Sequence, residues 1–347
     1  MVGKVAGTAA VYETMVALDL VKVPTAWAGP PKLAQGSGAG KTVAFLGAGI
    51  AGLSAAYELQ RAGYNCIVLE LLDRAGGRNF TARRGTRVVE DSGPNGRTEQ
   101  VCDFDDNLYM NLGPGRLPYH HRRVMHYCRE FEIPLEVYVL STTANLFQTD
   151  AAFKGTAQPR YRIASDTNSH ISELLGKAIN THALDDELTE EDRARFSALL
   201  ASFGGNSPAT VGGETPRNGC GTPMALEALC AANPRLPLRE LLNSEFWAHR
   251  FYQSDEGEWQ PTLFQAVGGM DRIVDAFVKR LRNPIRYGCE VRRIVNQPDK
   301  AIVEYRDRKT GKTKRLSADY CLSNMPLQKL AKLEANFSQD FKSAGDR

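Results

Sequence analysis

Short apolar runs alternate with a helical segment in the first third of the chain. Thr42–Leu46 is a continuous apolar run of strand length, and Cys66–Leu69 is a second one. The run between them, Leu53–Ala62, favours a helix. A short continuous apolar run is typical of a strand that is covered on both faces of a parallel sheet. We therefore predict a strand, a helix and a second strand, in that order.

The same alternation returns after residue 260. Here the pattern predicts a helix and three strands, with a Lys309–Lys312 turn between the last two: the helix Asp271–Leu281 and the strands Glu290–Val295, Ala301–Tyr305 and Tyr320–Leu322. This order is typical of a chain that comes back to complete a sheet begun earlier. The fold class that we predict is α/β, with a doubly wound, Rossmann-like parallel sheet.

Helical signals dominate the middle, from about residue 121 to 250. Thr189 and Asp192 have the spacing of a capping box, and a Gly- and Pro-rich segment, 204–223, indicates a surface loop. The predicted helices are His121–Glu130, Asp192–Ala201, Met224–Ala232 and Leu238–Phe251. We divide the chain into a signal-like segment and linker (1–40), a first sheet part (41–120), a helical and substrate-binding insertion (121–259) and a second sheet part (260–347).

The N-terminal segment is small and apolar from Ala6 to Leu20. Glu13, Asp19 and Lys22 interrupt it, so we expect no membrane span. It resembles the middle and end of a twin-arginine export signal, although no Arg-Arg pair precedes it. We expect an exported or periplasmic protein if such a pair lies upstream, and a cytoplasmic one otherwise. A short amphipathic helix docked on the fold is the alternative.

Charge and cysteine usage exclude several function classes. The 347 residues include 43 basic and 40 acidic ones, for a net charge of +3, which does not favour nucleic acid. The seven cysteines are scattered, odd in number and without a CxxC pair. That pattern argues against a disulfide framework and against zinc, so we predict no metal site.

Glycines follow the first predicted strand in the Gly-x-Gly-x-x-Gly pattern of a dinucleotide-binding turn. Gly47 permits the tight turn, Gly49 lets the backbone approach a pyrophosphate, and Gly52 lets the helix pack against the strand. Ala51 lies between them at the helix start, whose free N–H groups favour phosphate. Glu70 closes the second strand, where an acid can accept hydrogen bonds from a ribose diol. These five residues are candidate cofactor ligands.

The residues after Glu70 bear on which dinucleotide is bound. Arg74 and Gly76-Gly77-Arg78 stand where a nicotinamide enzyme would usually start another helix. A glycine pair allows close backbone approach, and the Arg78 guanidinium can pair bidentately with a phosphate. A basic surface turn is the alternative for this segment.

This Glu-x-x-x-Arg-x-Gly-Gly-Arg run resembles the flavin-containing amine oxidase family, which binds FAD. Leu71 departs from the family, which usually has Ala after the acid. Leu112–Pro118 resembles the L-amino acid oxidase branch more specifically. The resemblance implies that Gly113, Pro114 and Gly115 lie beside the flavin and that Arg116 binds the substrate carboxylate; an Arg on phosphate or surface is the alternative.

Two later segments extend the resemblance, which runs from about residue 41 to about 340. Val267–Met270 is similar to the family's entry into the second half of the cofactor domain. Cys289–Ile294 is similar to the strand whose Val, here Val291, meets the adenine side of FAD through its backbone. The glycine pair with Arg78 and the Gly-Pro-Gly-Arg segment both disfavour a nicotinamide dehydrogenase.

The resemblance implies oxidative deamination of an L-amino acid, or a related primary amine, to a keto acid, ammonia and hydrogen peroxide, with molecular oxygen as the oxidant. The family's lysine beyond the equivalent of Pro326 is not recognisable, so we assign no catalytic residue. We expect the C-terminal part of the fold to be missing. An inactive FAD-binding fragment, or one part of a split oxidase, is the alternative function. A homodimer or a complementing C-terminal chain would then be the partner.

Overall fold

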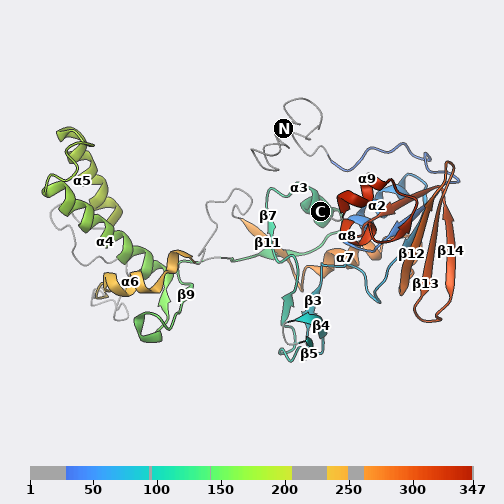
Figure 1. Ribbon diagram of the computed structural model, residues 1–347, viewed down its shortest axis with the longest axis horizontal. Helices are drawn as coiled ribbons and strands as arrows, with labels where there is room; N and C mark the ends of the chain where they lie inside the picture. Colours follow the sequence, from blue (N-terminus) through green and yellow to red (C-terminus); the bar gives the residue numbers. More distant parts are fainter. Residues whose placement is uncertain (1–28, 94–95, 141, 205–232, 249–261, 346–347) are drawn as a thin grey trace. The chain divides into compact units, whose positions relative to one another are not determined.

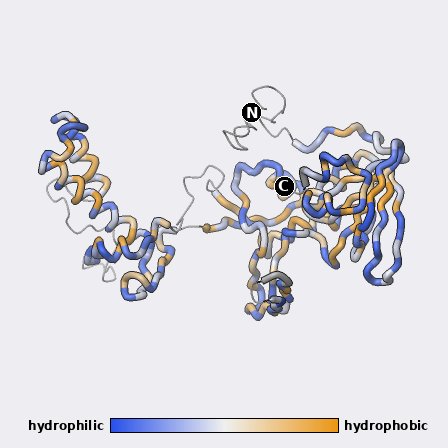
Figure 2. The backbone as a smooth tube through the Cα atoms, viewed as in Figure 1, coloured by the Kyte–Doolittle hydropathy of each residue, from blue (hydrophilic) through white to orange (hydrophobic). Residues whose placement is uncertain are grey.

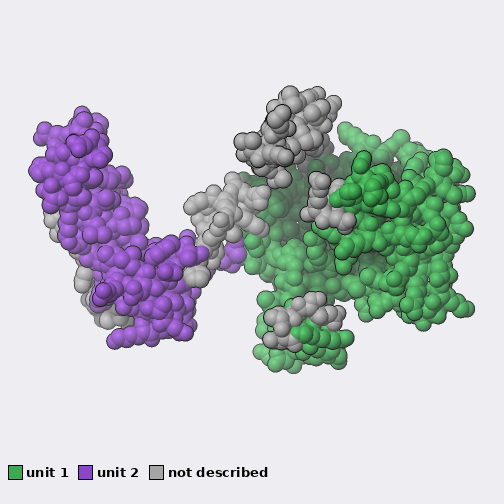
Figure 3. Space-filling view, in the orientation of Figure 1, with its two compact units in different colours: residues 1–138, 261–347 green, residues 139–260 purple. Residues whose placement is uncertain are grey.

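The computed structural model describes residues 29–93, 96–140, 142–204, 233–248 and 262–345 (Figure 1). The chain forms two compact units, residues 1–138 with 261–347 as unit 1 and residues 139–260 as unit 2 (Figure 3). We predicted an insertion from residue 121, but residues 121–138 belong to unit 1. The signal-like segment, the predicted helix Met224–Ala232 and nearly all of the 204–223 loop lie outside the described residues.

Unit 1 contains a three-stranded parallel sheet in the order β15-β1-β2. Its strands are β1 (Thr42–Leu46), β2 (Asn65–Leu69) and β15 (Tyr320–Ser323). Helix α2 (Ile50–Arg61) connects β1 to β2. The predicted strand, helix and strand are therefore confirmed, as is the return of the chain to the same sheet.

The two faces of this sheet are buried against different layers. Val43 and Phe45 point to a core that also holds Leu53 of α2 and Phe277 of α7 (Asp271–Val278). Ala44 and Leu46, the alternate residues of β1, belong to a second core. Because side chains alternate along a strand, an apolar run is needed when both faces are covered.

The second layer is a four-stranded sheet in the order β14-β13-β12-β16. Its strands are β12 (Cys289–Asn296), β13 (Ala301–Asp307), β14 (Thr313–Ala318) and β16 (Glu334–Ala335). A doubly wound sheet carries helices on both faces. In the described residues this mixed sheet, antiparallel across β14-β13-β12 and parallel between β12 and β16, covers one face instead, because Val303 and Leu316 pack against Leu46 and Leu69. The α/β class holds, with this difference in its second layer.

The remaining elements of unit 1 are short. Strand β3 pairs with β6, and strand β4 pairs with β5. A separate three-stranded sheet has the order β7-β11-β8. The strands are β3 (Thr81–Arg83), β4 (Arg87–Gly93), β5 (Gly96–Val101), β6 (Tyr109–Asn111), β7 (Leu117–Pro118), β8 (Leu135–Val137) and β11 (Leu263–Ala266). The helices are α3 (Arg122–Glu130), α8 (Leu327–Leu330) and α9 (Gln339–Gly345). Cys128 and Phe131 join α3 and the turn after it to the unit 1 core.

Unit 2 is mainly helical. Its elements are α4 (Arg160–Asn180), α5 (Glu190–Gly204), α6 (Leu238–Ser244), β9 (Leu146–Phe147), β10 (Gln158–Pro159), η2 (Phe153–Gly155) and η4 (Phe246–Ala248). The tube through α4 and α5 alternates orange and blue, as expected for amphipathic helices (Figure 2). The capping box is confirmed, since the Asp192 amide donates to the Thr189 hydroxyl at 3.2 Å. Helix α6 ends at Ser244, before the predicted Phe251, because Glu245 is left-handed (φ 47°).

Two further expectations concern cysteines and membranes. Five cysteines lie among the described residues, and all are free: Cys66, Cys102, Cys128, Cys289 and Cys321. Across the described stretches we find no helix with the length and apolar character that a bilayer crossing requires.

Candidate functional site

The glycine turn between β1 and α2 has the backbone shape that its sequence predicts. Gly47 has a φ of +105°, which favours glycine, and its N–H donates to the Leu69 carbonyl at 2.8 Å. A Cβ atom at residue 52 would lie 2.4 Å from the Gly47 carbonyl oxygen. Helix α2 begins at Ile50 with Gly49 as its N-cap, and this cap makes no side-chain hydrogen bond within the described part of the chain. The first N–H groups of α2 are therefore suited to an anion.

Glu70 lies directly behind this turn and is 6% exposed. Its Oε2 accepts from the Ala48 N–H at 2.7 Å, and its Oε1 accepts from the Leu72 N–H at 2.8 Å. A carboxylate offers about four acceptor positions, so two remain after these bonds. Glu70 thus ties the glycine turn to the end of β2, a structural role that its position in the motif does not reveal.

The Gly76-Gly77-Arg78 segment lies against the glycine turn. The Gly76 N–H donates to the Ala48 carbonyl at 2.8 Å, and residues 49 and 76 form an isolated parallel bridge. Gly76 and Gly77 have φ values of +96° and +55°. The Arg78 side chain is exposed, whereas Arg74 donates to the Gly77 carbonyl at 2.9 Å. Arg74 therefore holds the turn, and Arg78 stays available at its surface.

The Gly-Pro-Gly-Arg segment, residues 113–116, contacts the Gly76-Gly77-Arg78 segment. A Cβ atom at residue 113 would lie 2.0 Å from the Arg78 carbonyl oxygen, so Gly113 is in direct backbone contact. Pro114 is exposed, and a Cβ at Gly115 would meet no heavy atom within 4 Å in the described structure. Arg116 is half-buried and directly precedes β7. Three segments that are far apart in sequence therefore converge: 47–52, 76–78 and 113–116.

Val291 lies in β12, on the side of unit 1 that contacts the end of β2. The Cys289 N–H donates to the Glu70 carbonyl at 2.8 Å, and the Glu70 N–H donates to the Arg286 carbonyl at 2.9 Å. Val291 follows two residues later, next to a bulge between Val291 and Arg293. Burial raises the pKa of the neighbouring Tyr287, and the charge of Glu70 raises it further. The structure thus brings the Val291 strand to the backbone of Glu70.

Asn324 is a residue at this site that we did not predict. It follows β15, and its N–H donates to the Leu46 carbonyl at 2.8 Å. Its side-chain Nδ2 would lie 2.4 Å from a Cβ at residue 49 and 3.5 Å from one at residue 52. The available signal was a polar residue directly after a strand, because the carboxyl ends of neighbouring parallel strands share one edge of the sheet.

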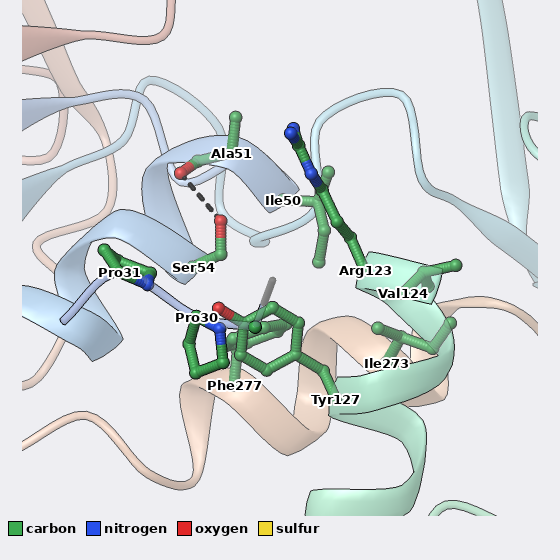
Figure 4. Close-up of a pocket in the computed structure, with 11 residues that line it drawn as sticks. Pro30, Pro31, Ile50, Ala51, Ser54, Arg123, Val124, Tyr127, Ile273 and Phe277 are labelled. Carbon is green, nitrogen blue, oxygen red and sulfur yellow. Dashed lines mark hydrogen bonds between the residues drawn. The ribbon is translucent and has the colours of Figure 1, made fainter. Parts of the chain in front are cut away.

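A cavity of about 480 Å³ opens beside the first turn of α2, between α2, α3 and α7. Its walls are largely apolar and include Ile50, Ala51 and Phe277. Figure 4 shows Arg123 extending from α3 toward Ile50 and Ala51, with Pro30 next to Tyr127. Ala51, one of the predicted ligands, therefore also borders an apolar cavity.

The family assignment follows from comparison with known proteins. The profile of a family described as flavin containing amine oxidoreductase matches residues 50–345. The chain belongs to this family. Its members bind a flavin, and the cofactor that this membership implies is FAD.

Three proteins that are similar to this chain have names that describe amino acid oxidases. Flavin-dependent L-tryptophan oxidase RebO of Lentzea aerocolonigenes is 28% identical over 314 residues, which cover 84% of this chain and 60% of the relative. Putative L-amino-acid oxidase YobN of Bacillus subtilis (strain 168) is 22% identical over 312 residues, covering 84% and 56%. L-amino-acid oxidase BmooLAAO-I of Bothrops moojeni is 42% identical over 98 residues, covering 28% and 16%. The chain thus spans 56–60% of the length of the first two relatives.

The residues present fit the dinucleotide that the family binds. Side chains at residues 49, 52 and 113 would collide with Asn324 or with backbone, so glycine at these positions allows the segments of the site to lie close together. The start of α2 supplies N–H groups for a pyrophosphate, and Glu70 keeps acceptor positions for hydroxyl groups. The donor and acceptor set therefore suits phosphate and ribose.

Proposed function

We propose that this chain binds FAD and takes part in the oxidative deamination of an L-amino acid, or a related primary amine. The observation that supports this best is the convergence of the glycine turn, the Gly76–Arg78 segment and the Gly113–Arg116 segment. Gly76 contacts Ala48 through a 2.8 Å hydrogen bond, and Gly113 packs on the Arg78 carbonyl. These contacts support a single site in which the glycine turn would bind phosphate and Arg116 would bind the substrate carboxylate.

The proposed cofactor ligands divide by the part of FAD that each would meet. Gly47, Gly49, Ala51 and Gly52 would hold the pyrophosphate through backbone, with Arg78 pairing with a phosphate. Glu70 would accept from the ribose hydroxyls. The Val291 backbone would meet the adenine, and Gly113, Pro114 and Gly115 would lie beside the flavin ring. These eleven ligands, counting Arg116 next to the ring, all come from unit 1.

Arg116 is the proposed substrate ligand. Its planar guanidinium can hold an α-carboxylate through two parallel hydrogen bonds, which fixes the orientation of the substrate Cα. FAD, when bound, would supply the two-electron acceptor for the Cα–H bond. Overall, amino acid, water and O₂ give keto acid, ammonia and hydrogen peroxide. The protein would bind the substrate, orient its Cα toward the flavin and exclude competing reactions.

The test measures cofactor and product separately. The purified chain is incubated with FAD, freed of unbound flavin by gel filtration and scanned for flavin absorbance. Peroxide is then measured with pooled L-amino acids and with primary amines that lack the carboxylate. Arg116→Lys is the matched variant, because it keeps the charge and loses the planar fork.

We expect bound flavin and, with a complementing C-terminal chain supplied, peroxide with amino acids and a sharp loss of kcat/KM in Arg116→Lys. Equal turnover of amines and amino acids would exclude the carboxylate-binding role and leave amine oxidation standing. Bound flavin without peroxide would make the chain an FAD-binding protein. A protein that retains no flavin would contradict the proposal.

We also propose that a second copy of the chain or a complementing chain associates with unit 1. Tyr320 and Leu322 lie on β15, an edge strand of the parallel sheet, and are 52% and 43% exposed, so this edge presents apolar side chains that a partner could cover. Light scattering of the purified chain tests self-association, and the variant Leu322→Lys should reduce the measured mass if β15 is the contact.

A further inference from the structure

The side chain of Asn111 joins three elements at the entrance to the Gly-Pro-Gly-Arg segment. Asn111 is the last residue of β6, two positions before Gly113. Its Oδ1 accepts from the Thr81 hydroxyl at 2.8 Å and from the Met270 N–H at 2.9 Å. Thr81 belongs to β3, and Met270 is the N-cap of α7. A single amide oxygen therefore ties β6 to β3 and to the start of α7.

The partners of Asn111 are themselves fixed. The Thr81 side chain, in a residue that is 2% exposed, accepts from the Asp271 N–H at 3.2 Å. The Asp271 carboxylate pairs with both terminal nitrogens of Arg83 at 2.8 Å. Such a bidentate pair has a defined geometry and keeps the start of α7 against β3. Asn111 is thus attached to a rigid frame.

The Gly113–Arg116 segment lies directly beyond this frame. The Leu112 N–H donates to the Phe80 carbonyl at 2.9 Å, and a Cβ at Gly113 would lie 2.0 Å from the Arg78 carbonyl oxygen. Residues 114–116 themselves adopt no helix or strand. The segment is held at its far end by β7, which pairs with β11, and at its first residues by the contacts of Asn111, Leu112 and Gly113. Asn111 contributes the side-chain hydrogen bonds at that first end.

We propose that Asn111 is a positioning residue that aligns the Gly113–Arg116 segment, and through it the Arg116 guanidinium, by accepting hydrogen bonds from Met270 and Thr81. The alignment of the segment stands on the contacts above. Its consequence for a substrate carboxylate rests on the proposed function of Arg116.

The first experiment measures amide hydrogen exchange of the purified chain without FAD. Asn111→Leu removes the acceptor at similar volume, and Asn111→Asp keeps an oxygen that can accept both hydrogen bonds. Asn336→Leu is the matched control, because Asn336 also makes two hydrogen bonds, to the N–H and carbonyl of Asn296, at the far end of β12. Exchange rates are compared in the peptides 108–118 and 267–273.

In Asn111→Leu we expect exchange about tenfold faster in both peptides, as the loss of a hydrogen bond or two predicts. Asn111→Asp should restore the original rates, and Asn336→Leu should affect only the end of β12. Unchanged exchange in 108–118 would overturn the proposal. A rise that spreads equally to β1 and α2 would overturn it too, because Asn111 would then support the whole fold.

The second experiment measures steady-state kinetics of the FAD-loaded chain. A misaligned Arg116 should raise KM for amino acids about tenfold in Asn111→Leu, with a smaller change in kcat, and Asn111→Asp should rescue it. A pure change in kcat would contradict alignment through Arg116. A wild-type chain that oxidises no amino acid would refute the proposed function, whereas the exchange result would still decide the role of Asn111.

Discussion

Glu70 shows how one side chain can have two duties at this site. Its place after β2 predicts a ribose ligand, and the structure adds hydrogen bonds from the Ala48 and Leu72 N–H groups. The Ala48 N–H is buried, so removing the carboxylate leaves it unsatisfied behind the glycine turn, whereas the Leu72 N–H belongs to an exposed residue and can bond to water. The ribose-binding role proposed for Glu70 predicts that loss of cofactor affinity and loss of stability are coupled at this residue.

The first prediction separates these two effects at Glu70. Glu70→Ala should lower the free energy of unfolding by about 1–3 kcal/mol, the cost of leaving the buried Ala48 N–H unsatisfied. Glu70→Gln keeps one acceptor oxygen and should lose less stability, while still binding FAD more weakly. Urea unfolding and FAD titration measure the two quantities. Glu334→Ala is the control, since Glu334 is 73% exposed in its ion pair with Arg293. Equal unfolding energies for all three variants and the wild type would show that the Glu70 hydrogen bonds are unimportant.

The second prediction ranks three glycine-to-alanine variants by the atoms that a new Cβ would meet. Gly52→Ala collides with the Gly47 carbonyl oxygen at 2.4 Å and should cost about 1–3 kcal/mol, because backbone must move. Gly49→Ala collides with the end of the Asn324 side chain, which can rotate away, and should cost less. Gly115→Ala meets nothing within 4 Å in the described structure and should change stability by less than about 0.5 kcal/mol. Thermal unfolding gives the order, and a reversed order would refute the packing argument.

The residues of the site differ in how far sequence alone could identify them. Gly47, Gly49 and Gly52 have a fixed spacing around a turn, so local pattern is enough to place them. Asn111 and Asn324 act through contacts with residues that are distant in sequence, such as Met270 and Leu46. No local pattern contains those contacts, although the place of Asn324 directly after a strand was a usable signal for that residue.

Among the elements, the strands of the central sheet were the most predictable. The predicted strand Thr42–Leu46 has the same bounds as β1, because burial on both faces leaves a continuous apolar run. Helix α2 begins at Ile50, earlier than the predicted Leu53, since its first turn is also the glycine motif. The β4–β5 hairpin was not predicted. The described side chains of β5 are all exposed, so the sequence of that strand lacks the alternating apolar pattern by which a strand is recognised.

The third prediction concerns the β13–β14 turn, which Asp307 organises. Its carboxylate accepts from Lys314 Nζ at 2.7 Å and from the Thr310 and Lys309 N–H groups at 3.1 and 3.0 Å. The Lys314 hydrogen bond, followed by the Thr310 N–H, lowers the pKa of Asp307 to about 2. Because the folded pKa lies below the ordinary value of 3.8, this stabilisation is present above about pH 4 and is lost as pH falls toward 2.

Two variants test that pH window. Asp307→Asn keeps an acceptor oxygen for the turn, and Lys314→Gln removes the ammonium group that favours the carboxylate. Both should reduce the loss of stability between pH 5 and pH 3 that urea unfolding measures in the wild type. In the wild type, the amide shifts of Lys309 and Thr310 should titrate near the lowered value. Titration near 3.8 instead would show that the ion pair has no effect on Asp307.

At the scale of the whole molecule, unit 1 is assembled from two separate parts of the chain. The fourth prediction follows from the Tyr138 N–H, which donates to the Leu263 carbonyl at 2.9 Å across the point where unit 2 is inserted. Replacing residues 139–260 by a short Gly-Ser linker should therefore leave unit 1 folded. Circular dichroism should lose the helical signal of α4 and α5, and FAD titration should retain binding. An insoluble or unfolded product would contradict the independence of unit 1.

The pairing of β1 with β15 also has a consequence for biosynthesis. The Thr42 N–H donates to the Asp319 carboxylate at 2.7 Å across 277 positions of sequence. During synthesis on the ribosome, β1 and β2 emerge early, and the strand that completes their sheet emerges only after unit 2 has been made. Contacts of such long sequence separation form slowly, because the loop between them must close first. The nascent chain therefore holds an open apolar sheet edge for most of its translation, and chaperones that cover such edges should raise its yield.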